Sequence, residues 1–272
     1  MPAASLLLAD LYLYPVKSLG GFRVPEAEVQ ARGFRHDRRW LIVDARGQFL
    51  TQRNIPEMAL LHLELGHNGF VIRHIRRPEL RPLLVPFEAS ADRTQFVTVW
   101  DDMVFAYRGT NEQDQWLSEA LGQPCRLVFM PDVALRPVDD GKVPGLVSFA
   151  DAYPFLLIGQ ASLDDLNQRL EQPLPMNRFR PNLVVTGTLP YAEDTWHEFR
   201  VGELAFRGIR PCGRCPVTTT DQLTAERSAE PLRTLAQYRK AGNKVMFGMN
   251  VVGPASGVLR TGGAVEVLSH HA

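Results

Sequence analysis

The sequence predicts a mainly β protein with some helix, of the α+β class, and three observations support this. Roughly a dozen short apolar or alternating segments are separated by turn residues, against about three segments with helical spacing. Several turns have the composition that joins neighbouring antiparallel strands. No G-x-G-x-x-G or P-loop motif is present, which disfavours the doubly wound sheets that bind dinucleotides or ATP. We therefore expect antiparallel β-barrels with a few peripheral helices.

The first half of the chain predicts paired strands. Asn68-Gly69 tolerates positive φ and marks a hairpin, whereas the Arg- and Pro-rich residues 76–86 predict irregular structure. Strand alternation places Arg38 on the same face as Trp40. The predicted strands of this half are residues 6–14, 26–31, 37–44, 49–51, 58–65, 70–75, 96–100 and 103–107.

Three segments carry the spacing and the end signals of helices. Asn111 is the expected cap of a helix over residues 111–121. Ser162, with an acidic residue three positions later, is the expected cap of the second helix. Pro231 starts the third helix, and Gly242 ends it.

The second half of the chain alternates predicted strands with polar loops. Residues 131–145 contain three prolines and predict a long loop, either a domain junction or a cover over a site. Residues 222–230 predict a second polar loop. The predicted strands of this half are residues 126–130, 155–158, 183–185, 204–209, 217–220, 247–252, 258–259 and 265–268.

Composition excludes several classes of protein. The chain has 272 residues, with 30 basic and 30 acidic side chains, so no overall charge draws it to nucleic acid or to acidic membranes. No stretch reaches the roughly 18 apolar residues of a membrane span, and the first residues lack the basic start of a signal peptide. Three cysteines do not predict a disulfide framework. We expect a cytoplasmic protein without nucleic-acid or membrane partners.

Two of the three cysteines form the motif Cys212-x-x-Cys215. Arg210 and Arg214 flank them, and nearby positive charge favours the thiolate form that binds metals or reacts. The run 217–220 that follows is rich in β-branched residues, so the pair is expected in a loop that enters a strand.

Four interpretations of this pair remain open from the residues alone. A zinc site needs four ligands, but Cys125 stands alone and His197 is not paired with another histidine. A thioredoxin-type motif opens a helix, whereas proline and threonines follow here. The third interpretation is that the two cysteines are small buried side chains of a β domain, with no chemical role. The fourth interpretation is a single thiolate ligand to a soft metal that a cofactor largely ligates itself.

Six short motifs in a fixed order resemble those of a known family. The chain is similar to the molybdenum-cofactor-binding proteins that join a MOSC domain to an N-terminal β-barrel, and most of all to the mitochondrial amidoxime-reducing component and its bacterial relatives. The resemblance spans nearly the whole chain and implies an N-terminal β-barrel-like domain over residues 1–125 and a MOSC β-barrel domain over residues 126–272. The motifs are Pro15-Val16-Lys17-Ser18, Asp37-Arg38 before Trp40, Ser162-Leu163-x-x-Leu166-Asn167, Phe179-Arg180-Pro181-Asn182, Ala192-Glu193-Asp194-x-Trp196 and Cys212-x-x-Cys215-x-x-Thr218-Thr219.

The resemblance implies a site for the molybdenum cofactor (Mo-molybdopterin). Cys215 would be the catalytic residue and the protein's metal ligand, with Cys212 auxiliary. The cofactor carries a phosphate, so its pocket should offer cations and hydrogen-bond donors. Residues 152 and 153 are Ala and Tyr where some relatives have Thr and Ser, and residue 250 is Asn where some have Tyr. The implied cofactor-binding residues are Lys17, Ser18, Arg38, Tyr153, Arg180, Asn182, Arg214, Cys215 and Asn250.

The resemblance also implies a molybdenum-dependent oxidoreductase, with a role in detoxification. Its substrates would be N-hydroxylated small molecules such as hydroxylamines, amidoximes and N-hydroxylated bases. The metal would take oxygen from the substrate and pass from Mo(IV) to Mo(VI). Some relatives carry an iron–sulfur domain with four cysteines, which this sequence lacks, so the electrons are expected from a flavin reductase or a small iron–sulfur or haem protein. Asp194 is either a proton donor or a structural turn residue.

Two other functions remain open. A cysteine persulfide at Cys215 would make the chain a sulfur carrier, a sulfurtransferase of metal-cofactor assembly. A non-enzymatic cofactor-binding or storage module is the third possibility.

Overall fold

The computed structural model describes residues 5–138 and 143–271. Its strands outnumber its helices throughout, and the predicted mainly β, α+β fold is confirmed. The helices are α1 (Asn111–Leu121), α2 (Gln160–Gln168) and α3 (Leu232–Leu235), with the 3-10 turns η1 (Pro56–Leu60), η2 (Met176–Arg178), η3 (Ala192–Thr195) and η4 (Pro216–Thr219). The strands are β1 (Leu7–Leu13), β2 (Phe22–Val24), β3 (Glu26–Gln30), β4 (Gly33–Phe34), β5 (Trp40–Val43), β6 (Leu61–Gly66), β7 (Gly69–His74), β8 (Leu83–Pro86), β9 (Thr94–Val99), β10 (Asp102–Arg108), β11 (Arg126–Phe129), β12 (Phe155–Gly159), β13 (Leu183–Thr186), β14 (Trp196–Val201), β15 (Leu204–Gly213), β16 (Lys240–Ala241), β17 (Lys244–Val252), β18 (Ser256–Arg260) and β19 (Val265–His270).

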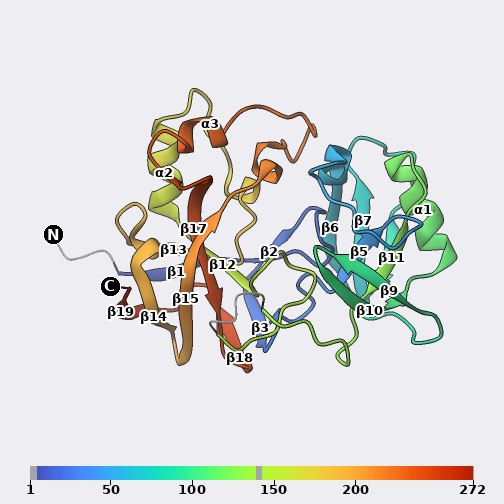
Figure 1. Cartoon of the computed structure of the whole chain (residues 1–272), viewed down its shortest axis with the longest axis horizontal. Coiled ribbons are helices and arrows are strands. Elements are labelled where there is room, and N and C mark those ends of the chain that lie inside the picture. Colours follow the sequence, from blue (N-terminus) through green and yellow to red (C-terminus); the bar gives the residue numbers. More distant parts are fainter. Residues whose placement is uncertain (1–4, 139–142, 272) are drawn as a thin grey trace.

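The strands form two groups that lie side by side (Figure 1). The terminal group, residues 7–34 and 155–270, contains the large sheet β19-β14-β15-β17-β12-β13-β1-β2 and the small sheet β18-β3-β4. Its core includes the fully or almost fully buried Leu8, Phe155 and Trp196. Both ends of the described chain therefore lie in this group.

The central group, residues 40–129, contains the sheets β5-β11-β10-β9 and β6-β7-β8, which α1 covers. Trp40 is fully buried, and its ring centroid lies 5.0 Å from that of Phe129. The predicted division at residues 125 and 126 stays a prediction. In the folded protein, strands from before and after this boundary are hydrogen-bonded in the same sheets, since β5 pairs with β11 and β1 pairs with β13.

Helix α1 begins one residue earlier than its expected cap. Thr110, rather than Asn111, is the N-cap: its hydroxyl accepts the Gln113 N–H at 3.2 Å, and the Gln113 side chain accepts the Thr110 N–H at 2.9 Å. Asn111 is the first helical residue and accepts a hydrogen bond from Arg93 at 2.6 Å. The reciprocal capping box satisfies two backbone donors, which decides the start of the helix.

Replacing Thr110 with alanine is expected to cost about 1 kcal/mol of unfolding free energy, because the cap bond to Gln113 is lost. Urea unfolding measures this change. Asn111→Ala is the matched control and should cost clearly less, since its side chain contact is on the exposed surface. A larger loss for Asn111→Ala would contradict the assignment of the cap.

The other two predicted helices also differ from expectation. Ser162 is an internal residue of α2, and its hydroxyl donates to the buried Glu193 carboxylate at 2.8 Å. Gly159, which ends β12, is the N-cap instead. Helix α3 has only four residues, and Gly242, with φ of 60°, forms the turn of the β16–β17 hairpin. The glycine is therefore needed for the tight turn between β16 and β17, rather than for the end of a helix.

Several strand predictions also need correction. Residues 49–51 form no strand, with an isolated bridge from Phe49 to Val43, and residues 58–60 belong to η1. Residues 83–86 form β8 instead of irregular structure, because they pair with β7 and bury Leu83 and Val85. Residues 216–219 form the turn η4 instead of a strand. The hydroxyls of Thr218 and Thr219 donate to the Cys215 and Pro216 carbonyls at 3.1 and 2.7 Å, and such local bonds compete with a strand ladder.

Candidate functional site

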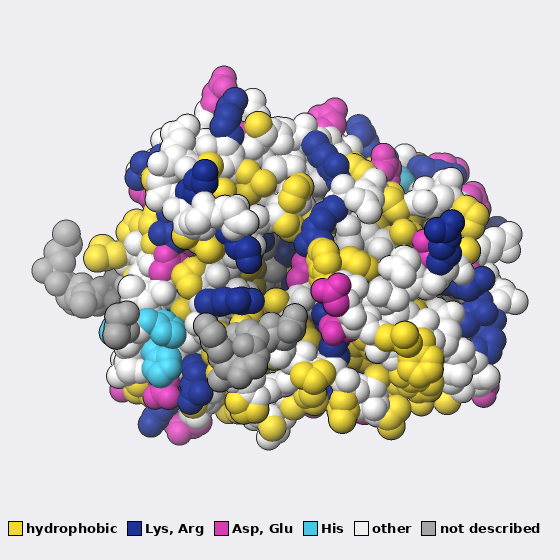
Figure 2. Space-filling view, viewed as in Figure 1, with side chains coloured by type: hydrophobic (Ala, Val, Ile, Leu, Met, Phe, Trp, Pro, Cys, Tyr) yellow, Lys and Arg dark blue, Asp and Glu magenta, His cyan; other side chains and the backbone are white. Residues whose placement is uncertain are grey.

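A cavity of about 440 Å³ brings together all nine residues implied as cofactor contacts. Figure 2 shows Lys and Arg side chains around a hollow near the middle of the displayed face. Residues of both strand groups and of the loops between them line the cavity. That the nine residues contact a cofactor stays a prediction. None of the described residues of 131–145 lines this cavity, and residues 139–142 of that predicted cover lie outside the described residues.

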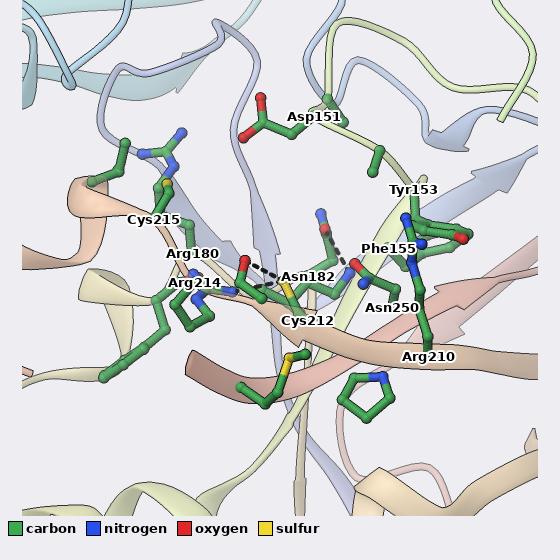
Figure 3. A pocket seen from close by; sticks show the side chains of 18 of the residues that line it. Asp151, Tyr153, Phe155, Arg180, Asn182, Arg210, Cys212, Arg214, Cys215 and Asn250 are labelled. Carbon is green, nitrogen blue, oxygen red and sulfur yellow. Dashed lines mark hydrogen bonds between the residues drawn. The ribbon is translucent and has the colours of Figure 1, made fainter. Parts of the chain in front are cut away.

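The two cysteines sit at different positions of the wall (Figure 3). Cys212 belongs to β15, whereas Cys215 is the extended N-cap residue of η4. The expected loop before a strand is therefore a strand followed by a tight turn. Arg53 Nη2 lies 3.5 Å from Cys215 Sγ.

Arg214 turns toward the other cysteine. Its Nη1 donates to Cys212 Sγ at 3.2 Å, and its Nη2 donates to the Phe179 carbonyl at 2.6 Å. Its Nε is buried and has no hydrogen-bond partner among the described residues. Arg214 therefore lines the cavity with its Nε donor unused.

Arg38 enters the cavity from a backbone position outside the strand. Its φ is 49°, in the left-handed region, and β5 begins two residues later at Trp40. The alternation argument that placed Arg38 on the Trp40 face is therefore wrong, although Arg38 does line the cavity. Asp37, 2% exposed, accepts the Tyr14 N–H at 2.8 Å and forms an ion pair with Arg38. Arg38 Nη1 also donates to Asn182 Oδ1 at 3.0 Å, so three motif residues position one another.

Arg180 lies beside Arg38 around one aromatic ring. The guanidinium carbons of Arg38 and Arg180 each lie 4.3 Å from the Tyr14 ring centroid. Burial lowers the pKa of Arg180 to about 10. Its Nη1 donates to the Leu19 carbonyl at 2.6 Å. Two cations in one wall, only one of them paired with a carboxylate, favour an anionic ligand.

The cavity residues that the sequence predictions missed include Arg53 and Asp151. Asp151 forms ion pairs with Lys17 and, at 3.2 Å, with Arg53. Desolvation would raise the pKa of Asp151, but the charges of Lys17 and Arg53 outweigh it and lower that pKa below its ordinary value. Burial lowers the pKa of Lys17, and the Asp151 charge opposes this. The only sequence feature that could have indicated Asp151 is its position two residues before Tyr153, which is one of the implied cofactor contacts.

Asp151 is expected to make folding stability fall in acid. Its folded pKa lies below the ordinary 3.8, so its stabilisation is fully present above that value and is lost as pH falls through the folded pKa. Screening of the half-exposed carboxylate keeps the effect small. Urea unfolding at neutral pH and at about pH 3 should show a smaller acid loss for Asp151→Asn than for the wild type.

The control for this measurement is Asp101→Asn, which removes an exposed carboxylate of a turn. It should lose as much stability in acid as the wild type. An Asp151→Asn protein with the wild-type acid loss would show that the ion pairs with Lys17 and Arg53 contribute nothing to folding.

The remaining predicted contacts lie on two sides of the cavity. Ser18 has φ of 66°, and its carbonyl accepts from Gln52 at 2.8 Å. Asn250 of β17 pairs in register with Arg210 of β15, and the Arg210 guanidinium lies 5.3 Å from the centroid of the buried Tyr153 ring. The tyrosine at position 153 therefore offers an aromatic wall where a hydroxyl side chain was in doubt.

Asp194 lies away from these residues. It belongs to η3, pairs with Arg239, and is not part of the cavity wall. Of the two roles left open for it, this position favours the structural one.

The donor set fits a phosphate-bearing cofactor that brings most of its own metal ligands. Seven Lys or Arg side chains line the cavity against one carboxylate. Within the described residues, no three His, Cys, Asp or Glu side chains gather so as to hold a metal ion. Such a cofactor requires a thiol ligand, surplus positive charge and free donors, and the wall offers two thiols, Cys212 and Cys215, with the unpartnered Arg214 Nε.

Comparisons with known proteins identify both halves of the chain. Residues 5–124 match the MOSC N-terminal beta barrel domain, and residues 144–266 match the MOSC domain. No helix in residues 5–138 or 143–271 is long and apolar enough to cross a membrane.

The similar proteins are of two kinds. The chain is 33% identical to mitochondrial amidoxime-reducing component 1 of Mus musculus and 32% identical to that of Homo sapiens, covering 96% of this chain and 82% of each relative. It is 35% identical to the molybdenum cofactor sulfurase of Oryza sativa subsp. japonica over 89% of this chain, and it spans only 32% of that relative. With both domains matched and most of the amidoxime-reducing components covered, the chain belongs to the family of MOSC-domain proteins with an N-terminal MOSC β-barrel.

Proposed function

We propose that this chain is a molybdenum-cofactor-dependent oxidoreductase that reduces N-hydroxylated compounds, among them hydroxylamines, amidoximes and N-hydroxylated bases. The observation that carries the proposal is that Cys215, one of two thiols in the wall, lies on a cavity lined by seven Lys or Arg side chains. The extent of the likeness supports it, because the alignment covers 82% of the mouse amidoxime-reducing component but 32% of the rice sulfurase.

The chain's own residues would hold the cofactor from several sides. Cys215 would be the metal ligand, and Lys17, Arg38 and Arg180 would donate to anionic groups. Arg214 would use its free Nε in the same way. When bound, the cofactor supplies a molybdenum centre that exchanges an oxygen atom and two electrons. Asp37 keeps Arg38 in place and Asp151 keeps Lys17 in place, so that little rearrangement of these two is needed on binding.

The reaction sets the requirements for a partner. Reducing an N–OH group to N–H consumes two electrons and two protons and releases water. We propose that a separate flavin reductase or small iron–sulfur or haem protein supplies the electrons. The proposal further assigns the reaction to the cytoplasm and to the detoxification of N-hydroxylated compounds.

A second function, sulfur carriage, is supported by a specific observation. The likeness to the rice molybdenum cofactor sulfurase covers 89% of this chain and therefore includes the Cys212–Cys215 segment. Arg53 beside the Cys215 sulfur would also stabilise a persulfide anion.

Turnover of benzamidoxime tests the proposal. Protein from a host that makes the cofactor is mixed with a chemically reduced viologen dye, and benzamidine formation is followed. We expect benzamidine in proportion to the molybdenum content. Molybdenum-loaded protein that reduces neither benzamidoxime nor a hydroxylamine would contradict the proposed reductase activity. Metal-free protein with a persulfide on Cys215 would establish the sulfur carrier instead.

A further inference from the structure

The Arg53 guanidinium is fixed against the Cys215 thiol by groups from different parts of the chain. Nη2 lies 3.5 Å from Cys215 Sγ and 3.2 Å from Asp151 Oδ2. The guanidinium carbon lies 4.3 Å from the centroid of the Trp100 ring. A planar cation held by a carboxylate and an aromatic face loses little freedom when it binds a ligand.

Most of the hydrogen-bonding capacity of this guanidinium is unused. Nη2 carries both contacts, and among the described residues Arg53 Nε and Nη1 have no partner. The side chain lines the cavity and is 22% exposed. The unused N–H groups of Nε and Nη1 can each donate a charge-assisted hydrogen bond to an oxygen of a carboxylate.

The local charge is also uncompensated. Asp151 serves both Lys17 and Arg53, so one negative charge faces two positive ones. The other hydrogen bond of Lys17 goes to the neutral Phe149 carbonyl at 2.7 Å. This surplus favours an anion next to the sulfur.

We propose that Arg53 forms an anion subsite beside Cys215 that binds a carboxylate of the substrate. The reaction at this subsite rests on the proposed function. The substrate class is then N-hydroxylated compounds that carry a carboxylate a few bonds from the N–O group. Arg53 thereby selects among the substrates that the cavity admits.

Alkylation of the full-length, cofactor-free chain tests the subsite without any turnover. Iodoacetate is anionic and iodoacetamide is neutral, and the same thiolate attacks the CH2 carbon of either and displaces iodide, so the ratio of their rates cancels the thiolate fraction. Mass analysis of peptides separates Cys215 from Cys212. Cys212 is the internal control, because its sulfur contacts Arg214 instead of Arg53.

Arg53→Gln is expected to lower the iodoacetate-to-iodoacetamide ratio at Cys215 about fivefold, the effect of one unit charge about 4 Å away in a water-filled cavity with the dielectric constant of bulk water. The ratio at Cys212 should not change, and Arg53→Lys should keep most of the wild-type ratio at Cys215. An unchanged ratio at Cys215 in folded Arg53→Gln protein overturns the subsite. In the wild type, benzoate should slow the iodoacetamide reaction at Cys215 more than benzamide does, and equal effects would also overturn it.

Kinetics of the molybdenum-loaded enzyme extend the test to substrates. Arg53→Gln should raise KM for 4-carboxybenzamidoxime more than KM for benzamidoxime, and equal increases count against the subsite. If the chain binds no molybdenum, the proposed function fails on its own. The alkylation ratios still decide whether Arg53 binds anions, so the two failures are distinguishable.

Discussion

Replacing Cys215 with alanine is expected to abolish molybdenum binding, whereas Cys212→Ala should retain most of it. Cys215 lines the cavity at the start of η4 and is contacted by Arg53, and no other thiol outside the same motif lies in the wall. Cys212 is engaged by Arg214, 3.2 Å away. Elemental analysis of both variants and the wild type, made in one host that supplies the cofactor, measures the difference.

The two variants control for each other, since both remove one thiol from the same segment. Equal molybdenum in Cys215→Ala and the wild type would remove Cys215 as the metal ligand. A wild type without molybdenum, from a host confirmed to make the cofactor, would end the cofactor proposal itself. Persulfide detection on Cys215 would then be the next measurement.

Replacing Asp37 with alanine is expected to lower the free energy of unfolding by about 3–5 kcal/mol, because Arg38 is left as an unpaired charge in a buried site. The Tyr14 N–H also loses its acceptor. Asp37→Asn should cost less, because its amide oxygen can still accept that hydrogen bond. Urea unfolding of the cofactor-free protein gives these values.

Asp132→Ala is the matched control for this prediction. Asp132 pairs with the neighbouring Arg39, but its side chain is 83% exposed, so its loss should cost at most about 1 kcal/mol. Equal costs for Asp37→Ala and Asp132→Ala would show that burial of the Asp37–Arg38 pair does not matter. A stable Asp37→Ala protein would imply that Asn182 and the Arg180 carbonyl suffice to hold Arg38.

Much of the site could be predicted because its residues lie in short motifs. The resemblance named nine positions that are far apart in the sequence, and one cavity contains them all. Arg53 was missed because nothing in its own segment distinguishes it from the other arginines. It reaches Cys215 only through the folded arrangement, across 162 residues of sequence.

Local structure was harder to predict from the sequence where two local signals competed. Thr110 and Gln113 formed the pattern of a capping box, yet Asn111 is also a good cap residue, and only the observed bonds decide between them. Ser162 had the same kind of pattern, but the buried Glu193 takes its hydroxyl. The threonines after Cys215 had strand propensity, and hydrogen bonds to the preceding carbonyls prevailed.

The pairing of β3 with β18 has a consequence for the order in which the chain folds. Residues 26–30 leave the ribosome long before residues 256–260, and they cannot complete their sheet until residues 256–260 have been made. Residues 40–43 and 126–129 meet much earlier, so the central group can close its sheets while the terminal group is still incomplete. Truncation before residue 256 should therefore leave β3 paired with β4 alone and the central sheets intact.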